Sequence, residues 1–122
     1  MNELNYASLE ASKKLVDNGI VLETEAGWYK IFRPGCHAFV MVLSMRSGNE
    51  KFYGDNYPAP SMAEVWRELP EQYEDEYLRV FKDGDRTFCG RSRYGEYANG
   101  LSSKNPTDAL INLLIYIRKE KL

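Results

Sequence analysis

Histidine and cysteine are scarce in this chain, which has one histidine, His37, and two cysteines, Cys36 and Cys89. Neither cysteine belongs to a Cys-x-x-Cys pair, so a zinc site would need these three residues and a carboxylate at no recognised spacing. A Ser-His-Asp or Cys-His nucleophilic site would have to use His37. We therefore expect no metal, no cofactor and no catalytic residue. We interpret both cysteines as small buried apolar residues; a disulfide stays open, although nothing requires one.

An excess of charge of either sign is also missing. The chain has 16 basic and 18 acidic residues and a net charge of -2. That balance argues against a dedicated nucleic-acid or anionic-membrane binder, whose affinity depends on excess Lys and Arg. The glycines form neither a phosphate-binding loop nor a dinucleotide-binding fingerprint. Asp83-Gly84-Asp85 resembles the start of a calcium loop, but Tyr94 stands where the bidentate Glu would be needed.

Long hydrophobic runs are absent as well. The longest run, residues 38–43, is far shorter than the ~20 residues that span a bilayer. The first residues lack the basic and apolar regions of a signal peptide, so we expect a cytoplasmic protein. The 122 residues are enough for one ordinary domain and too few for two, which predicts a single domain over residues 1–122.

Three segments have the pattern of helices. The first covers about residues 5–18, with Leu4, Ala7, Ala11 and Leu15 on one stripe, and it is followed by Gly19, a favoured residue just past a helix end. The second follows Ser61-Met62-Ala63-Glu64, a capping box, and places Met62, Val65, Trp66 and Leu69 on one face before Pro70. The third begins at Asn105-Pro106 and has a core stripe of Leu110, Leu113, Leu114 and Ile117, widened by Ile111 and Ile115.

Strand patterns occupy the remaining ordered segments. Residues 28–32 and 38–43 are rich in strand formers, and the second run is apolar at both parities, as in a strand covered on both faces. Residues 77–82 and 86–89 form a hairpin around Asp83-Gly84-Asp85, while 51–60 and 95–104 are expected to be loops. The order α-β-β-α-β-β-α predicts an α+β domain with one antiparallel sheet of about four strands and three helices packed on it.

Two surface clusters are candidates for binding. Arg86, Arg91 and Arg93 lie near aromatic residues, and such pairings bind single-stranded nucleic acid, although a solvated hairpin edge also carries charge. Tyr is enriched at protein interfaces, and four tyrosines in the expected loops are candidates for an interface or for capping the core edge: Tyr53, Tyr57, Tyr94 and Tyr97.

Three segments together resemble one protein family. They are residues 15–20 followed by Thr24 and Trp28, the segment of residues 58–70 that begins Pro-Ala-Pro-Ser-Met-Ala-Glu-Val-Trp, and the segment of residues 105–117 that contains Asp-Ala-Leu-Ile-Asn-Leu-Leu-Ile-Tyr. The chain is similar to small phage- and prophage-associated proteins of gut anaerobic bacteria, for which no activity is established. The resemblance implies an α+β fold and a phage or mobile-element setting, and it transfers no catalytic residue.

The leading functional hypothesis is therefore a non-enzymatic, phage- or mobile-element-associated accessory protein that acts by binding a protein partner. One alternative is a nucleic-acid-associated protein that uses Arg86, Arg91 and Arg93. Another is an enzyme with an unrecognised site near His37. The partner and the oligomeric state are not readable from the sequence.

Overall fold

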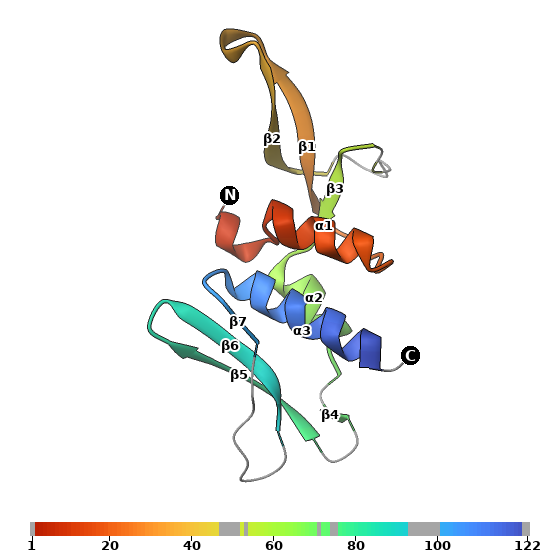
Figure 1. Cartoon of the computed structure of the whole chain (residues 1–122), viewed down its shortest axis with the longest axis vertical. Coiled ribbons are helices and arrows are strands. Elements are labelled where there is room, and N and C mark those ends of the chain that lie inside the picture. Colours follow the sequence, from red (N-terminus) through yellow and green to blue (C-terminus); the bar gives the residue numbers. More distant parts are fainter. Residues whose placement is uncertain are drawn as a thin grey trace.

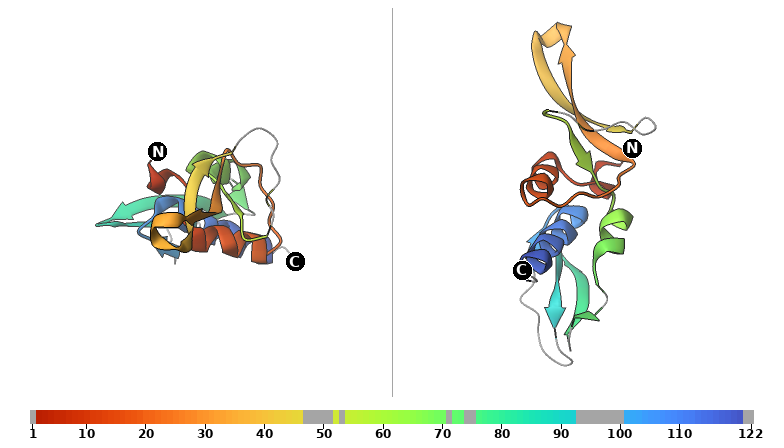
Figure 2. Two further views of the ribbon diagram at one scale, coloured as in Figure 1. Left: turned by 90° about the horizontal axis from the view of Figure 1, so that it is seen from above. Right: turned by 90° about the vertical axis from the view of Figure 1, so that its right-hand side faces the viewer.

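The computed structural model describes residues 2–46, 52, 54–70, 72–73, 76–92 and 101–120. These residues form an α+β fold with three α-helices and two antiparallel sheets. The helices lie in the middle of an elongated molecule, and one sheet lies toward each end (Figures 1 and 2). The predicted α+β class is confirmed, but the prediction of one sheet of about four strands is wrong, because the helices separate the two strand groups.

The first helix, α1 (Leu9–Asp17), begins later than the sequence predicts. A short 3-10 helix, η1 (Glu3–Asn5), precedes it, and the hydroxyl of Ser8 then caps α1 by accepting from the amide of Ala11. Leu4 is 53% exposed and does not join the stripe of Ala11 and Leu15. The end of the helix is as predicted, with Gly19 at a φ of 70°, a conformation that costs little only for glycine.

The second helix, α2 (Met62–Glu68), begins with the predicted capping box. The hydroxyl of Ser61 accepts from the amide of Glu64 at 3.2 Å, and the Glu64 carboxylate accepts from the amide of Ser61 at 2.7 Å. Val65 and Leu69 are buried, whereas Trp66 is 51% exposed. The predicted apolar face is therefore narrower than expected, and it excludes Trp66.

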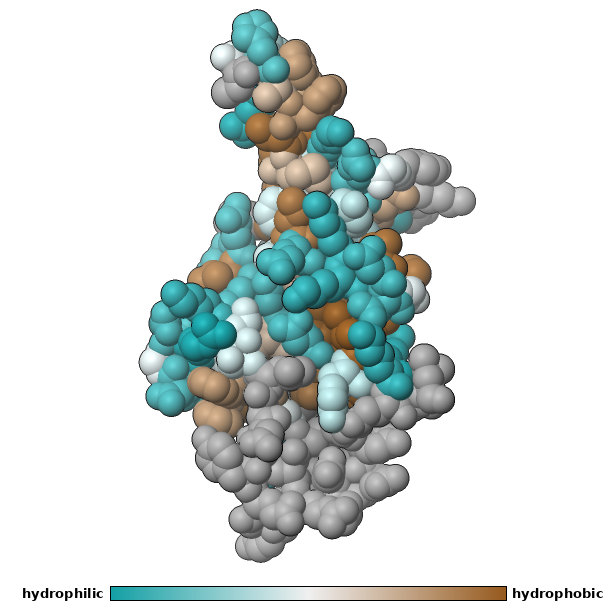
Figure 3. All heavy atoms as spheres, viewed as in Figure 1, coloured by the Kyte–Doolittle hydropathy of each residue, from teal (hydrophilic) through white to brown (hydrophobic). Residues whose placement is uncertain are grey.

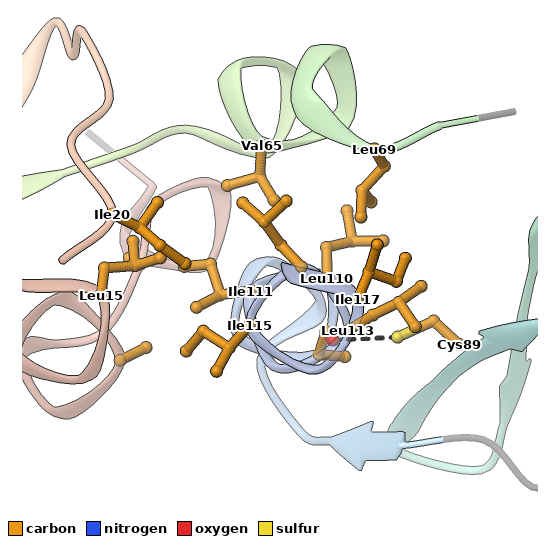
Figure 4. Packing of buried hydrophobic residues seen from close by; sticks show 14 residues of the cluster. Leu15, Ile20, Val65, Leu69, Cys89, Leu110, Ile111, Leu113, Ile115 and Ile117 are labelled. Atoms are coloured by element: carbon orange, nitrogen blue, oxygen red, sulfur yellow. Dashed lines mark hydrogen bonds between the residues drawn. The ribbon is translucent and has the colours of Figure 1, made fainter. Parts of the chain in front are cut away.

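The third helix, α3 (Pro106–Glu120), is the centre of the hydrophobic core. Figure 4 shows it surrounded by α1, α2 and the strand that carries Cys89. Leu113 and Leu114 are 2% and 1% exposed, as predicted. The buried side chains go well beyond one stripe: Ala109, Leu110, Ile111, Leu113, Leu114, Ile115 and Ile117. Such an enclosed helix is hydrophobic almost all round because elements pack on several of its sides.

The start of α3 also holds residues near the beginning of the chain. The hydroxyl of Thr107 donates to the carbonyl of Leu4 at 3.0 Å, and the Asn105 amide donates to the carbonyl of Tyr6 at 3.1 Å. In return, the amide of Ser8 donates to Asp108 Oδ1 at 2.8 Å. These side-chain bonds satisfy backbone groups that no regular ladder pairs, and they tie segments about 100 residues apart in the sequence.

The first sheet has the order β2-β1-β3. Its strands are β1 (Ala26–Arg33), β2 (Ala38–Met45) and β3 (Tyr57–Ala59). The last of these lies in a segment predicted as a loop; Pro58 obscures it in the sequence, because a proline is tolerated in an edge strand and not in a central one. The prediction that residues 38–43 form a covered strand is wrong, since β2 is an edge strand with no buried residue.

The second sheet has the order β4-β5-β6-β7. It contains β4 (Gln72–Tyr73), β5 (Glu76–Asp83), β6 (Arg86–Ser92) and β7 (Leu101–Ser103). The predicted hairpin of β5 and β6 is confirmed, with Gly84 at a φ of 63° in its turn. The strand β7 falls in the predicted loop of residues 95–104, because three largely polar residues carry no recognisable strand pattern.

Candidate protein-interaction ribbon

The main candidate surface is the two-stranded ribbon of β1 and β2 with its connecting turn, residues 26–45, called the ribbon below. It projects from the helices and forms one end of the molecule (Figures 1 and 2). A short 3-10 turn, η2 (Pro34–Cys36), joins the strands, and His37 closes it at a φ of 49°. The pairing is regular from Ala26–Met45 to Arg33–Ala38. The ribbon is therefore a continuous ladder of eight pairs without a bulge.

Three contacts hold the base of the ribbon on the helices. The indole of Trp28 donates to the carbonyl of Ala7 at 2.9 Å, and the hydroxyl of Tyr6 lies 3.8 Å from the sulfur of Met45. The amide of Glu25 donates to the carboxylate of Glu64 at 3.1 Å. Glu64 therefore joins the start of β1 to the capping box of α2.

The two faces of the ribbon follow from its register, because directly paired residues share a face. One face carries Tyr29, Val42, Ile31 and Val40, and Phe52 stacks on Tyr29 with ring centroids 5.7 Å apart. This ring lies over Gly27, where a Cβ atom would collide with it. The opposite face carries Trp28, Leu43, Lys30, Met41, Phe32 and Phe39. Both faces are thus largely apolar.

Burial decreases along β1 from the base to the free end of the ribbon. Ala26 is fully buried, whereas Ile31 is 41% exposed, Phe32 51% and Phe39 62%. Apolar residues are visible on the projecting ribbon in Figure 3. A two-stranded ribbon with no core behind it is at best marginally stable in water, and clustered exposed apolar side chains mark interaction surfaces. The free end of the ribbon therefore carries apolar side chains of the kind found in a hydrophobic core, and no other described element packs on them.

The ribbon carries two cations, Lys30 and Arg33, both on β1. The ammonium of Lys30 is 3.0 Å from Asp55 Oδ2 and lies 5.1 Å from the centroid of the Phe39 ring. The hydrogen bond and the positive charge of Lys30 lower the pKa of Asp55 below its usual value. The one lysine within the ribbon is therefore neutralised by a neighbouring carboxylate.

None of the four tyrosines that the sequence predicts as an interface belongs to the ribbon. Tyr57 lies in β3, half-buried, with the ammonium of Lys13 5.7 Å from its ring centroid. Tyr53, Tyr94 and Tyr97 lie outside the described residues. The ribbon was not among the predicted sites, although its sequence carries one signal: residues 38–45 contain no charged side chain.

The predicted arginine cluster is described only in part. Arg86 in β6 is half-buried, and its guanidinium donates to Ser102 on β7. The backbone of Arg91 lies in β6, and Arg93 lies outside the described residues. Arg86 thus holds two strands of the second sheet together.

The residues considered for nucleophilic chemistry lie in different parts of the fold, in the turn of the ribbon and in the second sheet. His37 is exposed at the free end of the ribbon, next to Cys36 of η2, whereas Cys89 is in β6 and fully buried against α3 (Figure 4). Cys89 is a free thiol that donates to the carbonyl of Ala109 at 2.9 Å. Burial raises the pKa of this thiol to about 12, so Cys89 is not a reactive thiolate at neutral pH.

A shallow hollow lies beside α2, lined by Val21, Leu22, Glu23, Glu64, Arg67 and Glu68. Two of its acidic groups have structural partners: Glu64 accepts from two backbone amides, and Glu68 pairs with Arg118 at 3.1 Å. Within the described part of the chain, no three His, Cys, Asp or Glu residues are grouped to hold a metal ion.

No family model, curated protein or solved structure matches this chain. Within the described residues, no helix is long and apolar enough to cross a membrane.

Proposed function

We propose that this protein is a non-enzymatic accessory protein that acts by binding a partner protein, and that the ribbon is its binding surface. The single observation that carries the proposal is the exposure of Ile31, Phe32 and Phe39 at the free end of a projecting ribbon. The phage or mobile-element setting is part of the proposal and rests on the sequence resemblance alone.

The physical basis is the cost of leaving these side chains in water. Burying a Phe side chain is worth about 1.5–3 kcal/mol, and aromatic residues dominate the energetic centres of protein interfaces. The rings of Phe32 and Phe39 lie with centroids 5.3 Å apart and so form one pair. A partner that covers this pair would gain both contributions at once.

The alternatives receive less support from the described residues. Arg86 is already bonded to Ser102, and a net charge of -2 opposes long-range attraction to nucleic acid. Among the described residues, no hydrogen-bond or ion-pair partner orients the exposed side chain of His37 for catalysis. Among the described residues, no group of side chains is assembled for nucleic-acid binding at the arginines or for catalysis near His37.

Affinity capture from the native host with purified protein as bait tests the proposal. The ribbon variant carries Phe32→Thr and Phe39→Thr, because Thr keeps the strand preference while removing the rings. The matched control carries Val21→Ser and Trp66→Ser, which removes side chains that are 87% and 51% exposed outside the ribbon.

We expect a specific partner to bind the wild type and the control and to bind the ribbon variant at least about tenfold more weakly. Circular dichroism should show all three proteins folded. Capture of the same proteins by the wild type and the ribbon variant would refute the ribbon as the binding surface.

A further inference from the structure

The outer edge of β2 carries backbone groups that no strand among the described residues pairs. In an antiparallel pair, the N–H and C=O of one residue point to the same side, and successive residues alternate. The amide of Arg46 donates to the carbonyl of Glu25 at 2.6 Å, while the amide of Lys30 donates to Asn56 Oδ1 on the opposite side of β1. Together with the register, these bonds direct the backbone groups of four β2 residues away from β1: Phe39, Met41, Leu43 and Met45.

No strand among the described residues pairs with this outer edge. Proteins normally protect such edges with charged side chains, proline or bulges. The part of β5 that extends past its pairing with β4 follows that rule, since it carries Arg79, Lys82 and Asp83. In contrast, β2 has the sequence Ala-Phe-Val-Met-Val-Leu-Ser-Met, without charge, proline or bulge. The edge of β2 is therefore open to a further strand.

The edge of β2 is also complementary to itself. We call the four residues whose backbone groups point away from β1 the outward residues. In an antiparallel pair of two β2 strands, each outward residue must lie opposite an outward residue of the second copy, because only these can exchange hydrogen bonds. This requirement leaves only a few possible registers. A register centred on Val42 pairs Met41 with Leu43, and Phe39 with Met45, of the second copy. This register uses all four outward residues, whereas centring on Met41 leaves Met45 unpaired.

The same register brings together the most exposed large side chains of the strand. Phe39 is 62% exposed and Met45 is 50% exposed, and both lie on one face. A methionine sulfur beside an aromatic ring is a favourable contact. Because β2 carries no charge, the two-fold operation brings no like charges together along the strand.

We propose that β2 pairs with β2 of a second copy of this chain, in a two-fold dimer whose shared sheet has the order β3-β1-β2-β2-β1-β3. The inference rests on the proposed function, because it names the partner for the edge of the same ribbon. The two-fold axis passes at Val42. The ribbon thereby becomes the middle of a six-stranded sheet.

Sedimentation equilibrium of the full chain measures the assembly directly. We expect a mass of twice the 14.1 kDa of one chain. Met41→Pro removes an outward N–H and leaves the bonds to β1 in place, and edge strands tolerate proline. Each dimer loses two backbone hydrogen bonds, so we expect its Kd to rise by about 5- to 150-fold. The control Val21→Ser changes a side chain that is 87% exposed outside the ribbon and should remain dimeric.

Cross-linking provides a second test that does not depend on the proline variant folding. In a Cys36→Ser background, Val42→Cys places two thiols opposite each other at a pair whose Cα atoms are about 4.5 Å apart, within the range that a disulfide spans. Oxidation should yield a covalent dimer. The control Val40→Cys faces Ser44 of the second copy and should not cross-link.

The outcomes separate this inference from the proposed function. A monomeric wild type that fails to cross-link through Val42→Cys overturns the dimer, and ribbon-dependent capture of another protein would still support the binding function. If Met41→Pro no longer captured that protein, the edge of β2 would bind a different protein and not a second copy of this chain. A dimer that survives Met41→Pro in a folded protein also overturns the edge pairing.

Discussion

Replacement of Glu64 by Ala should destabilise the protein well beyond the loss of an ordinary surface charge. Glu64 is 8% exposed. Its Oε1 accepts from the amide of Ser61 at 2.7 Å, and its Oε2 accepts from the amide of Glu25 at 3.1 Å. Losing part of a helix cap costs about 1 kcal/mol, and a partly buried amide without a partner costs about 1–3 kcal/mol. We therefore expect Glu64→Ala to lower the free energy of unfolding by about 2–4 kcal/mol.

Urea unfolding followed by far-ultraviolet circular dichroism measures this loss. The matched control is Glu68→Ala on the same helix, whose carboxylate is 44% exposed and pairs with Arg118; an exposed pair contributes about 0–1 kcal/mol. Glu64→Gln keeps one carbonyl acceptor and should lose an intermediate amount. Amide hydrogen exchange should increase at Glu25 and Ser61 in Glu64→Ala. A loss within about 0.5 kcal/mol of the Glu68→Ala value would refute the bridging role.

Three further predictions concern the core and the end of α1. Leu114→Ala removes a side chain that is 1% exposed and should lower the free energy of unfolding by about 2–5 kcal/mol. The control Val21→Ala, at a site that is 87% exposed, should change it by less than about 0.5 kcal/mol. Urea unfolding measures both changes. Gly19→Ala should cost about 1–2 kcal/mol, because alanine is strained at a φ of 70°, and a neutral result would contradict that conformation. In a Cys36→Ser background, Cys89 should react with a thiol reagent only on unfolding. The pKa of this thiol is raised from 9.0 to about 12. The contribution of the protonated thiol to the free energy of unfolding is therefore complete below pH 9, and between pH 9 and pH 12 it decreases by about 1.4 kcal/mol per pH unit. Cys89→Ala should remove this part of the pH dependence of stability.

Local chemistry in the sequence was sufficient to predict the helix ends. The capping box of Ser61 and Glu64, the cap at Asn105 and the left-handed Gly19 depend on residues three or four positions apart, and all three are present. The burial of Leu113 and Leu114 also followed from the helical period. Such features need no knowledge of the rest of the fold.

The division into two sheets could not be predicted in the same way. An apolar run such as residues 38–43 has the same pattern in a covered central strand and in an exposed ribbon, because periodicity reports the side chains and not their neighbours. Only the tertiary position of α3, between the two strand groups, decides between them. The candidate site was missed for this reason, and the four tyrosines were chosen on composition instead.

The hydrogen bonds from the start of α3 to residues 4–8 have a consequence for the order of events during synthesis. Residues 105–108 leave the ribosome about 100 residues after their partners, a delay of roughly 5–20 s at 5–20 residues per second. During that interval the ribbon has been made, while the helix on which the core depends has not. The early chain therefore carries an unprotected apolar strand edge before its anchor exists, and this period is when chaperone binding or pairing with a neighbouring nascent chain competes with folding.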